Sequence, residues 1–365
     1  MSEPIRVLHV LTGMGSGGAE AFLMNMYRNI DRSQVQFDFL LCSSENIYAE
    51  ELNNLGSRVY QIPKYTQHPI QNKQATQIFF HEHSYSIIHV HANALMNITP
   101  LIEAKRAGVP VRIMHSHSTS LKHKILQPLH QINKRLLHRW CTDRLACSDA
   151  AGKWMFPNDF VTIHNAINLE QFSYCTEDRS AVRQELGIPD GTFVIGHVGR
   201  FLPVKNHKFL FAVFQNVLMY NPNSILVLIG NGPLEQDIKS LAVQFKISDR
   251  ILFLGVRKDV GRIMNALDTF ILPSIYEGLG IAAIEAQANG LSVLCSDAIP
   301  KEAIITERVR QLPLTAGVEC WARELLCSDK KRESTYQALV AAGYDIHTEA
   351  HKLQEFYLNK SQELS

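Results

Sequence analysis

The feature that most constrains the fold is a repeated alternation between short apolar runs and longer amphipathic segments. In the first half of the chain, four apolar runs have the length of a strand: 5–12, 36–42, 84–92 and 111–117. A helical pattern lies between the first two runs, at 19–30, and another lies between the last two, at 96–108. Strands that alternate with helices form parallel sheets, because each helix returns the chain to the same end of the sheet. The sequence therefore predicts an α/β fold with a doubly wound parallel sheet.

The same alternation restarts at residue 193 and continues to residue 297. A chain of 365 residues exceeds the usual size of one domain, so we expect two Rossmann-like domains that face a central cleft. The polar, turn-rich stretch 169–192 is expected to be the linker and the entry to the second domain, with the boundary near residue 175. The predicted domains are thus 1–175 and 176–340.

A further helical pattern follows Gly343 and occupies about 341–365. Its apolar residues recur at helical spacing, so this face must pack on another surface. They are Ile346, Ala350, Leu353, Phe356 and Tyr357.

Composition excludes several classes of protein. With 46% hydrophobic residues the chain is not disordered, and a net charge of +1 gives no general field that would attract nucleic acid. The seven cysteines are widely spaced without a C-x-x-C pair, which argues against a disulfide framework or a thiolate zinc site. No signal peptide or apolar run of 18 residues is found, and we expect a cytoplasmic protein.

A glycine-rich turn, Gly13 to Gly18, follows the first predicted strand and opens into a helix. Backbone amides at such a turn can approach a phosphate closely. Dinucleotide binding would also require an acidic residue after the second strand, where this chain has Cys42 and Ser43. The turn therefore predicts either phosphate binding or a tight connection without a ligand, and it disfavours NAD.

The segment from Ser274 to Ala286 follows a strand of the second domain and contains Glu277 and Glu285. Eight residues of helix would place the two carboxylates about 80° apart, so they are not a paired catalytic dyad. If Glu277 lies in the turn and Glu285 in the helix, the helix N-terminus lies between them and can bind an anion. That arrangement suits a sugar nucleotide, although two solvated glutamates would show the same pattern.

Two cations, Arg200 and Lys205, follow the first strand of the second domain. Together they can neutralise a leaving diphosphate, whereas each alone is typical of a protein surface. Turns at 230–233 and 255–259 follow the next two strands and are expected to frame a nucleoside.

Histidines occur in two pairs at alternating positions, His89 with His91 and His115 with His117. A period of two places each pair on one face of a strand. We weigh three roles: a metal site, packing in the core, and contact of at least one imidazole with substrate. No carboxylate or thiolate cluster and no D-x-D motif accompanies them, so no metal is expected.

The segment 105–144 contains nine basic residues and one acid, Asp143, interleaved with apolar residues. It is either an ordinary amphipathic helix with a solvated basic face or a surface that docks on anionic lipid or on an acceptor bearing a diphosphate. Its basic members are Lys105, Arg106, Arg112, Lys122, Lys124, Lys134, Arg135, Arg139 and Arg144; the apolar ones are Leu121, Ile125, Leu126, Leu129, Ile132, Leu136, Leu137 and Trp140.

Over nearly its whole length the chain resembles the family 4 retaining glycosyltransferases of the GT-B fold, which include bacterial capsule, exopolysaccharide and O-antigen enzymes. The resemblance rests on GGAE at 17–20, HNAIN at 164–168, the Gly199-Arg200 and Lys205 motif, and the segment from Pro273 that contains E-x7-E. The chain departs from the family pattern at Asn165 to Asn168 and at Leu279 to Ala282, so the resemblance implies the fold but does not identify the donor sugar.

The resemblance implies a role for each motif residue. Arg200 and Lys205 would bind the donor diphosphate, and Glu277 with the amides after it would hold the sugar and phosphate. Glu285 would hold the ribose, His117 would approach the donor sugar, and the C-terminal helix would pack on the first domain. The remaining expected donor-binding residues are Gly17, Gly18, Gly199, Asn231, Val256, Arg257, Gly278, Leu279, Gly280 and Ile281.

The resemblance also implies an activity, namely metal-independent transfer from a UDP-sugar to a hydroxyl of a glycan or lipid-linked oligosaccharide, with retention. The expected partners are this donor and acceptor and, through residues 105–144, the inner membrane face; nucleic acid is not expected. Two alternatives stay open: a UDP-sugar 2-epimerase of the same fold, and a catalytically silent partner protein.

Overall fold

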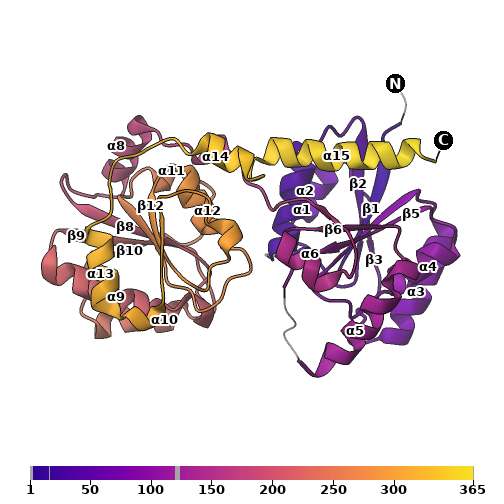
Figure 1. Cartoon of the computed structure of the whole chain (residues 1–365), viewed down its shortest axis with the longest axis horizontal. Helices are drawn as coiled ribbons and strands as arrows, with labels where there is room; N and C mark the ends of the chain where they lie inside the picture. The colour runs from indigo at the N-terminus through magenta and orange to yellow at the C-terminus, as the bar shows by residue number, and fades with distance from the viewer. Residues whose placement is uncertain (1–2, 16, 120–123, 365) are drawn as a thin grey trace. The chain divides into compact units, whose positions relative to one another are not determined.

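The computed structural model describes residues 3–15, 17–119 and 124–364. The chain forms two compact units, the first made of Met1–Ile167 with Gly343–Ser365 and the second of Asn168–Ala342 (Figure 1). The division between them thus falls after Ile167, whereas the sequence places it near residue 175.

The first unit is built on a seven-stranded parallel sheet with the strand order β3-β2-β1-β4-β5-β6-β7. The order reverses direction beside β1, as in doubly wound nucleotide-binding folds. The strands are β1 (Ile5–Leu11), β2 (Val35–Leu41), β3 (Val59–Gln61), β4 (Ile87–Ala92), β5 (Val111–Ser116), β6 (Asp143–Ala146) and β7 (Val161–Thr162).

Helices cover both faces of this sheet, so its central strands are apolar throughout. On β1, Val7 packs on one face with Phe22 and Phe37, and Leu8 packs on the other with Phe79. The helices are α1 (Gly18–Asn29), α2 (Ala49–Asn54), α3 (Pro69–Glu82), α4 (Thr99–Arg106), α5 (Gln127–Leu136), α6 (Asp149–Met155) and α15 (Ile346–Gln362).

The last helix, α15, completes the core of the first unit, in agreement with the expectation from the resemblance. It lies against α1 and β2 (Figure 1). Of the five predicted apolar residues, Phe356 is partly buried, and Ile346, Ala350, Leu353 and Tyr357 are fully buried. Residues of the HNAIN motif secure its start: the His164 amide donates to Glu349 at 2.6 Å and Ile346 donates to the Ile167 carbonyl at 3.0 Å.

The second unit repeats the same topology with six parallel strands in the order β10-β9-β8-β11-β12-β13. The strands are β8 (Phe193–Val198), β9 (Ser224–Ile229), β10 (Ile251–Phe253), β11 (Thr269–Leu272), β12 (Ser292–Ser296) and β13 (Val309–Leu312). The helices are α7 (Leu169–Phe172), α8 (Thr176–Glu185), α9 (His207–Tyr220), α10 (Glu235–Gln244), α11 (Val260–Met264), α12 (Ile281–Ala288), α13 (Val318–Leu326) and α14 (Tyr336–Ala341). On one face, Phe211 and Phe214 of α9 pack with Trp321 of α13.

The stretch 169–192, expected to be the linker and the entry to the second domain, forms α7 and α8 and belongs as a whole to the second unit. Helix α8 is polar and buries only Val182. Arg179 and Arg183 hold it in place by ion pairs of 2.6 and 2.8 Å to Asp268, a contact that hydrophobic periodicity does not reveal. Within the described residues, no helix combines the length and apolar character needed to span a bilayer.

Candidate active site

The best-organised group of predicted site residues lies at the carboxyl end of the second sheet, between β8 and β11, where the strand order reverses. Open α/β sheets bind ligands at this point. The loops after the two strands are joined directly, since the Ile275 amide donates to the Val204 carbonyl at 2.7 Å. Lys205 Nζ lies 2.5 Å from Glu277 Oε1, and the Ser274 hydroxyl donates to the same oxygen at 2.7 Å.

Local backbone conformation places Lys205 in this pair. A 3-10 turn, Pro203–Lys205, ends at Asn206, which has a φ of 57°, in the left-handed region. The lysine side chain then runs past Gly199, where an added Cβ would lie 3.2 Å from Lys205 Cε. Gly199 therefore leaves the space through which the ammonium reaches Glu277.

Arg200 differs from Lys205 in being exposed. Within the described ranges of the chain, no acid or carbonyl is bonded to its guanidinium. The site thus offers one cation held by a carboxylate and one that is free for an anion.

Helix α12 begins directly after this cluster, with Gly280 as its N-cap at a φ of 83°. The first amides of a helix have no intrahelical partner and attract negative charge. Gly278 is exposed and nothing would lie within 4 Å of an added Cβ, so the backbone before the helix is open. Leu279 and Ile281 flank the cap and are partly buried.

Glu285 lies in the second turn of α12 and is partly buried. Burial raises the pKa of its carboxyl group to about 8. Its carboxylate accepts no hydrogen bond from any residue in the described part of the chain. An acceptor in such surroundings gains most from a ligand that brings its own donors.

The remaining predicted residues of this unit occupy the neighbouring loops. The Phe201 amide donates to the Asn231 carbonyl at 2.7 Å, and the Gly230 amide donates to the Gly255 carbonyl at 2.8 Å. Val256 is exposed, and the Arg257 guanidinium forms a pair with Asp259 at 2.7 Å. The loops after β8, β9 and β10 are therefore connected, and they extend the site along the sheet.

Three predicted residues belong to the first unit. Gly17 caps α1 and Gly18 is its first residue, at the carboxyl end of β1. His117 follows β5, and its ring meets Phe22 of α1 edge-on at 5.2 Å. The structure therefore places His117 beside α1, the helix that follows the glycine turn.

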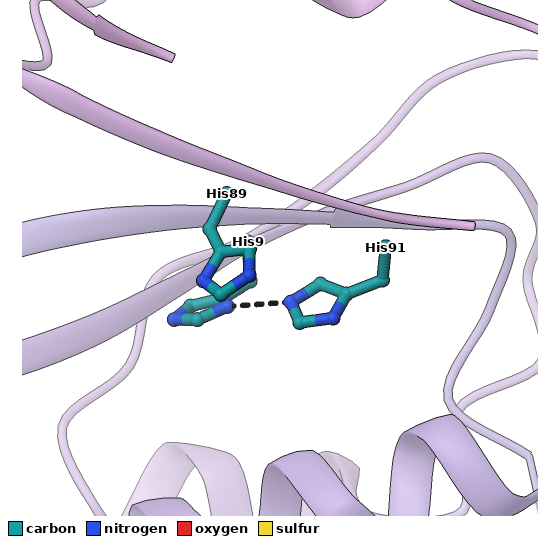
Figure 2. Close-up of side chains that lie close together, drawn as sticks. All are labelled: His9, His89 and His91. Atoms are coloured by element: carbon teal, nitrogen blue, oxygen red, sulfur yellow. Dashed lines mark hydrogen bonds between the residues drawn. The ribbon is translucent and has the colours of Figure 1, made fainter. Parts of the chain in front are cut away.

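The predicted histidine pairs do share a face, and they join a larger row of five imidazoles that includes His9 of β1. His9 donates to or accepts from His91 at 2.9 Å (Figure 2), and His91 is bonded in the same way to His117 at 2.8 Å. His89 is bonded to the Tyr357 hydroxyl at 2.5 Å and to His115 at 3.1 Å. Burial lowers the pKa of all five imidazoles, to about 3 for His9 and His117.

The basic segment 105–144 is not one helix. It contains the end of α4, strand β5, helix α5, a 3-10 turn at Leu137–Arg139 and the start of β6. Two of its predicted members, Leu121 and Lys122, lie outside the described residues. Several of its cations bond to backbone carbonyls: Lys105 to Arg139 at 2.7 Å, Arg112 to Trp140 at 2.8 Å, and Arg144 to Asp159 at 3.0 Å. Its exposed apolar residues gather on and just before α5: Ile125, Leu126, Leu129 and Ile132.

Comparison with known proteins identifies the family of this chain. Residues 16–171 match Glycosyltransferase Family 4, and residues 178–318 match Glycosyl transferases group 1. The putative glycosyltransferase EpsF of Bacillus subtilis is 34% identical over 375 residues, which cover 98% of this chain and 97% of EpsF. The chain is a glycosyltransferase with a Family 4 domain and a group 1 domain.

Two further relatives of this glycosyltransferase are named for steps in glycan synthesis. The UDP-Gal:alpha-D-GlcNAc-diphosphoundecaprenol alpha-1,3-galactosyltransferase of Escherichia coli is 29% identical over 58% of this chain and 58% of its own length. The capsular polysaccharide biosynthesis glycosyltransferase CapH of Staphylococcus aureus is 24% identical over 98% of this chain and 99% of its own.

Among solved structures, Anabaena HepE in complex with UDP has a TM-score of 0.79 and 19% identity, covering 97% of this chain and 100% of HepE. This likeness supports the GT-B fold. The chain is therefore a GT-B glycosyltransferase of polysaccharide biosynthesis, and neither an epimerase nor a silent partner is favoured.

Proposed function

We propose that this glycosyltransferase moves a sugar from a UDP-sugar to a hydroxyl of a glycan or lipid-linked oligosaccharide in bacterial surface polysaccharide synthesis. We further propose that transfer proceeds with retention and without a metal ion. The E. coli relative is named for a UDP-sugar donor and a diphosphoundecaprenol acceptor, and HepE was solved with UDP. These names support the choice of UDP and of a lipid-linked acceptor.

The observation that carries the proposal is the Glu285 carboxylate, which has no hydrogen-bond partner within the described residues although it is partly buried. A ribose diol brings two hydroxyl donors to such a carboxylate. Binding of the diol would lower the pKa of Glu285, because hydrogen bonds to the charged form stabilise it.

The cations and the helix N-terminus around Glu285 suit a diphosphate. Arg200 is free to form a bidentate pair with phosphate oxygens, and Lys205 supplies a second charge. With the first amides of α12 they would stabilise the charge that develops on the departing diphosphate, so that no metal is needed. Glu277 positions Lys205 and is proposed to bind the donor sugar together with the amides that follow it.

The other predicted residues take supporting roles in the proposal. Asn231, Val256 and Arg257 would lie near the nucleoside. In the first unit, Gly17 and Gly18 are proposed to act on the diphosphate and His117 on the donor sugar.

Calorimetric titration with UDP in the presence of EDTA tests the donor site. Wild-type protein is expected to bind UDP, and Glu285→Ala to weaken binding at least about tenfold, since two hydrogen bonds to a carboxylate are lost. Glu307→Ala, at an exposed glutamate of the same unit, should bind UDP like wild type. Unchanged affinity in Glu285→Ala would contradict the assignment, and binding of GDP or ADP instead of UDP would contradict the choice of nucleotide.

A turnover comparison with the matching UDP-sugar tests the catalytic roles. Lys205→Ala and Glu285→Ala should lower turnover far more than Glu20→Ala, which changes a side chain beside Gly17. Equal losses in the three variants would overturn the roles of Lys205 and Glu285.

We also propose that the enzyme is cytoplasmic and docks on the inner membrane face through the segment 105–144. Exposed Ile125, Leu129 and Ile132 lie close in sequence to exposed Arg135 and Arg139 on α5 and its extension. Apolar and basic side chains in such a pattern bind anionic lipid surfaces.

Vesicle co-sedimentation tests this docking. Vesicles that contain phosphatidylglycerol should bind the protein at low salt and release it as salt rises, whereas phosphatidylcholine vesicles should not bind. Ile132→Gln is expected to reduce binding more than Val243→Gln, which changes a similarly exposed apolar residue on α10. Equal binding to both lipids, or equal loss in both variants, would contradict docking through α5.

A further inference from the structure

Three imidazoles from adjacent strands form a hydrogen-bonded string that ends at His117. His9 of β1 is joined through Nδ1 to Nε2 of His91 at 2.9 Å, and Nδ1 of His91 is joined to Nε2 of His117 at 2.8 Å. His91 follows β4 residue His89, which is in register with His9. Each hydrogen bond in the string uses one ring nitrogen of each partner, so the tautomer of one ring fixes the tautomers of the other two.

The two ends of the string differ in their surroundings. At the inner end, Nε2 of His9 is buried without a hydrogen-bond partner, and the ring packs on Phe37 with centroids 4.0 Å apart. At the outer end, His117 is only partly buried, and no residue of the described chain is bonded to its Nδ1.

The chemistry of neutral imidazole allows two directions of donation along this string. Each ring carries one N–H and one lone pair. If His117 donates inward, His9 is left with a buried Nε2–H that has no acceptor among the described residues. If His9 donates outward, only a lone pair remains at Nε2 of His9, and the N–H at the far end belongs to Nδ1 of His117. Among backbone groups, a buried N–H without an acceptor is rarer than a buried carbonyl with an unused lone pair, and we apply the same order to the two nitrogens of a buried imidazole.

We propose that the string donates outward, so that His117 is held with its proton on Nδ1 and presents an N–H donor to an oxygen atom of the ligand. His9 and His91 are then positioning residues for His117. The proposal rests on the proposed function only in naming the ligand, where the matching acceptor is a hydroxyl or carboxylate oxygen of the donor sugar.

The electrostatic surroundings agree with a string of neutral rings. Burial lowers the pKa of His9 and His117 to about 3 and that of His91 well below its usual value. At neutral pH, His117 therefore acts as a hydrogen-bond donor, not as an imidazolium acid.

A metal ion is the main alternative, since two trios of histidine nitrogens lie within 4.8 Å of one another: His9, His89 and His91, and His91, His115 and His117. Each trio contains a pair of stacked rings. The centroids of His89 and His91 lie 4.3 Å apart at 18°, and those of His115 and His117 lie 4.2 Å apart at 16°. A ligand nitrogen binds along a lone pair in its ring plane, at about 2.0–2.1 Å from zinc, and stacked rings cannot aim two such lone pairs at one ion. The hydrogen-bonded string therefore fits the geometry better.

Nitrogen-15 NMR of the full-length, ligand-free protein labelled at histidine tests the proposal, because the two tautomers differ in their ring-nitrogen shifts. His117→Gln identifies the signals of His117. In wild type, the Nδ1–H form of His117 is expected to exceed the Nε2–H form by at least about tenfold.

Variants at His91 separate hydrogen bonding from packing. His91→Phe removes the donor to Nε2 of His117 and should bring the two tautomers to within about threefold of each other. His91→Asn should restore the Nδ1–H form, because its amide nitrogen can occupy the place of the imidazole Nδ1. His115→Phe is the matched control: His115 is buried and stacks on His117 without a hydrogen bond to it, so the tautomer should not change.

Each other outcome overturns the proposal. A dominant Nε2–H form in wild type means that the string donates inward, and an unchanged tautomer in His91→Phe means that the string does not control His117. Stoichiometric loss of these signals on addition of Zn²⁺ would establish a metal site instead. Failure to bind UDP would refute the proposed function but would leave the tautomer measurement intact.

Discussion

Glu285 combines a carboxyl group with surroundings that favour its neutral form. Its pKa in the folded protein is about 8, compared with 4.5 for an unperturbed glutamate, because burial removes water from the charged form. The folded state therefore binds this proton more tightly than the unfolded state does. The contribution of Glu285 to the free energy of unfolding is fully present below pH 4.5 and is lost as pH rises through about 8.

Glu285→Gln should remove this pH dependence, because glutamine does not ionise. At pH 9 the variant is expected to exceed wild type in free energy of unfolding by roughly 2 kcal/mol, a value discounted because the carboxylate is partly exposed. At pH 5 the difference should fall below about 1 kcal/mol, because the pH is then only slightly above the pKa of the unfolded carboxyl group. Urea unfolding at both pH values measures the difference, with Glu307→Gln as the exposed control. A constant difference between the two pH values would show that Glu285 does not titrate as stated.

Candidate site residues that follow a strand could be predicted from the sequence. Lys205 and Glu277 follow β8 and β11, so alternation alone places them at one end of the sheet. Their direct bond could not be predicted, since it depends on the left-handed Asn206 and on space beside Gly199. His9 was missed because a single histidine in an apolar run shows no period, and its register with His89 appears only once the strand order is known.

At the scale of elements, the short helix α11 is held against α7 by a close backbone approach. A Cβ added at Gly261 of α11 would lie 2.1 Å from the Gln171 carbonyl oxygen, so the backbone itself would have to move. Alanine ordinarily favours a helix over glycine by about 1 kcal/mol, but here the clash should exceed that gain.

Gly261→Ala is therefore expected to lower the free energy of unfolding by about 1–3 kcal/mol. Gly18→Ala at the start of α1 is a suitable control, because nothing lies within 4 Å of its added Cβ, and it should be neutral or slightly stabilising. Urea unfolding of both variants measures the effect. A Gly261→Ala variant as stable as wild type would contradict this prediction, because it would mean that α7 and α11 move apart at little cost in free energy.

Element types could be predicted where periodicity was strong and not where polar contacts replaced it. The strands and α15 follow their apolar patterns. Helix α8 buries little and depends on Arg179, Arg183 and Asp268, so its sequence looks like a linker. The basic segment looks like an amphipathic helix because the apolar residues just before α5, on α5 and in the following turn lie close together in sequence.

At the scale of the whole molecule, the first unit is made from two pieces of chain that are far apart in sequence. Residues 346–357 supply fully buried side chains to the same core as β1, β2 and α1. Without them, apolar surface on α1 and β2 would face water. The second unit, 168–342, is made from one continuous piece.

Fragments of the chain should therefore differ in resistance to protease. Residues 168–342 are expected to resist cleavage, and residues 1–167 to be cut rapidly unless a peptide of residues 343–365 is added. Limited proteolysis followed by mass spectrometry measures both. Equal resistance of 1–167 with and without the peptide would show that α15 is not needed to close the core.

The return of α15 to the first unit also sets an order of events during synthesis on the ribosome. The N-terminal 167 residues emerge first, yet their core stays open until the last helix has left the exit tunnel. The second unit has all of its residues earlier and can fold while translation continues. The unit that carries His117 and the glycine turn is thus begun first and completed last, and a nascent chain that stalls before residue 346 exposes the apolar faces of α1 and β2 to chaperones.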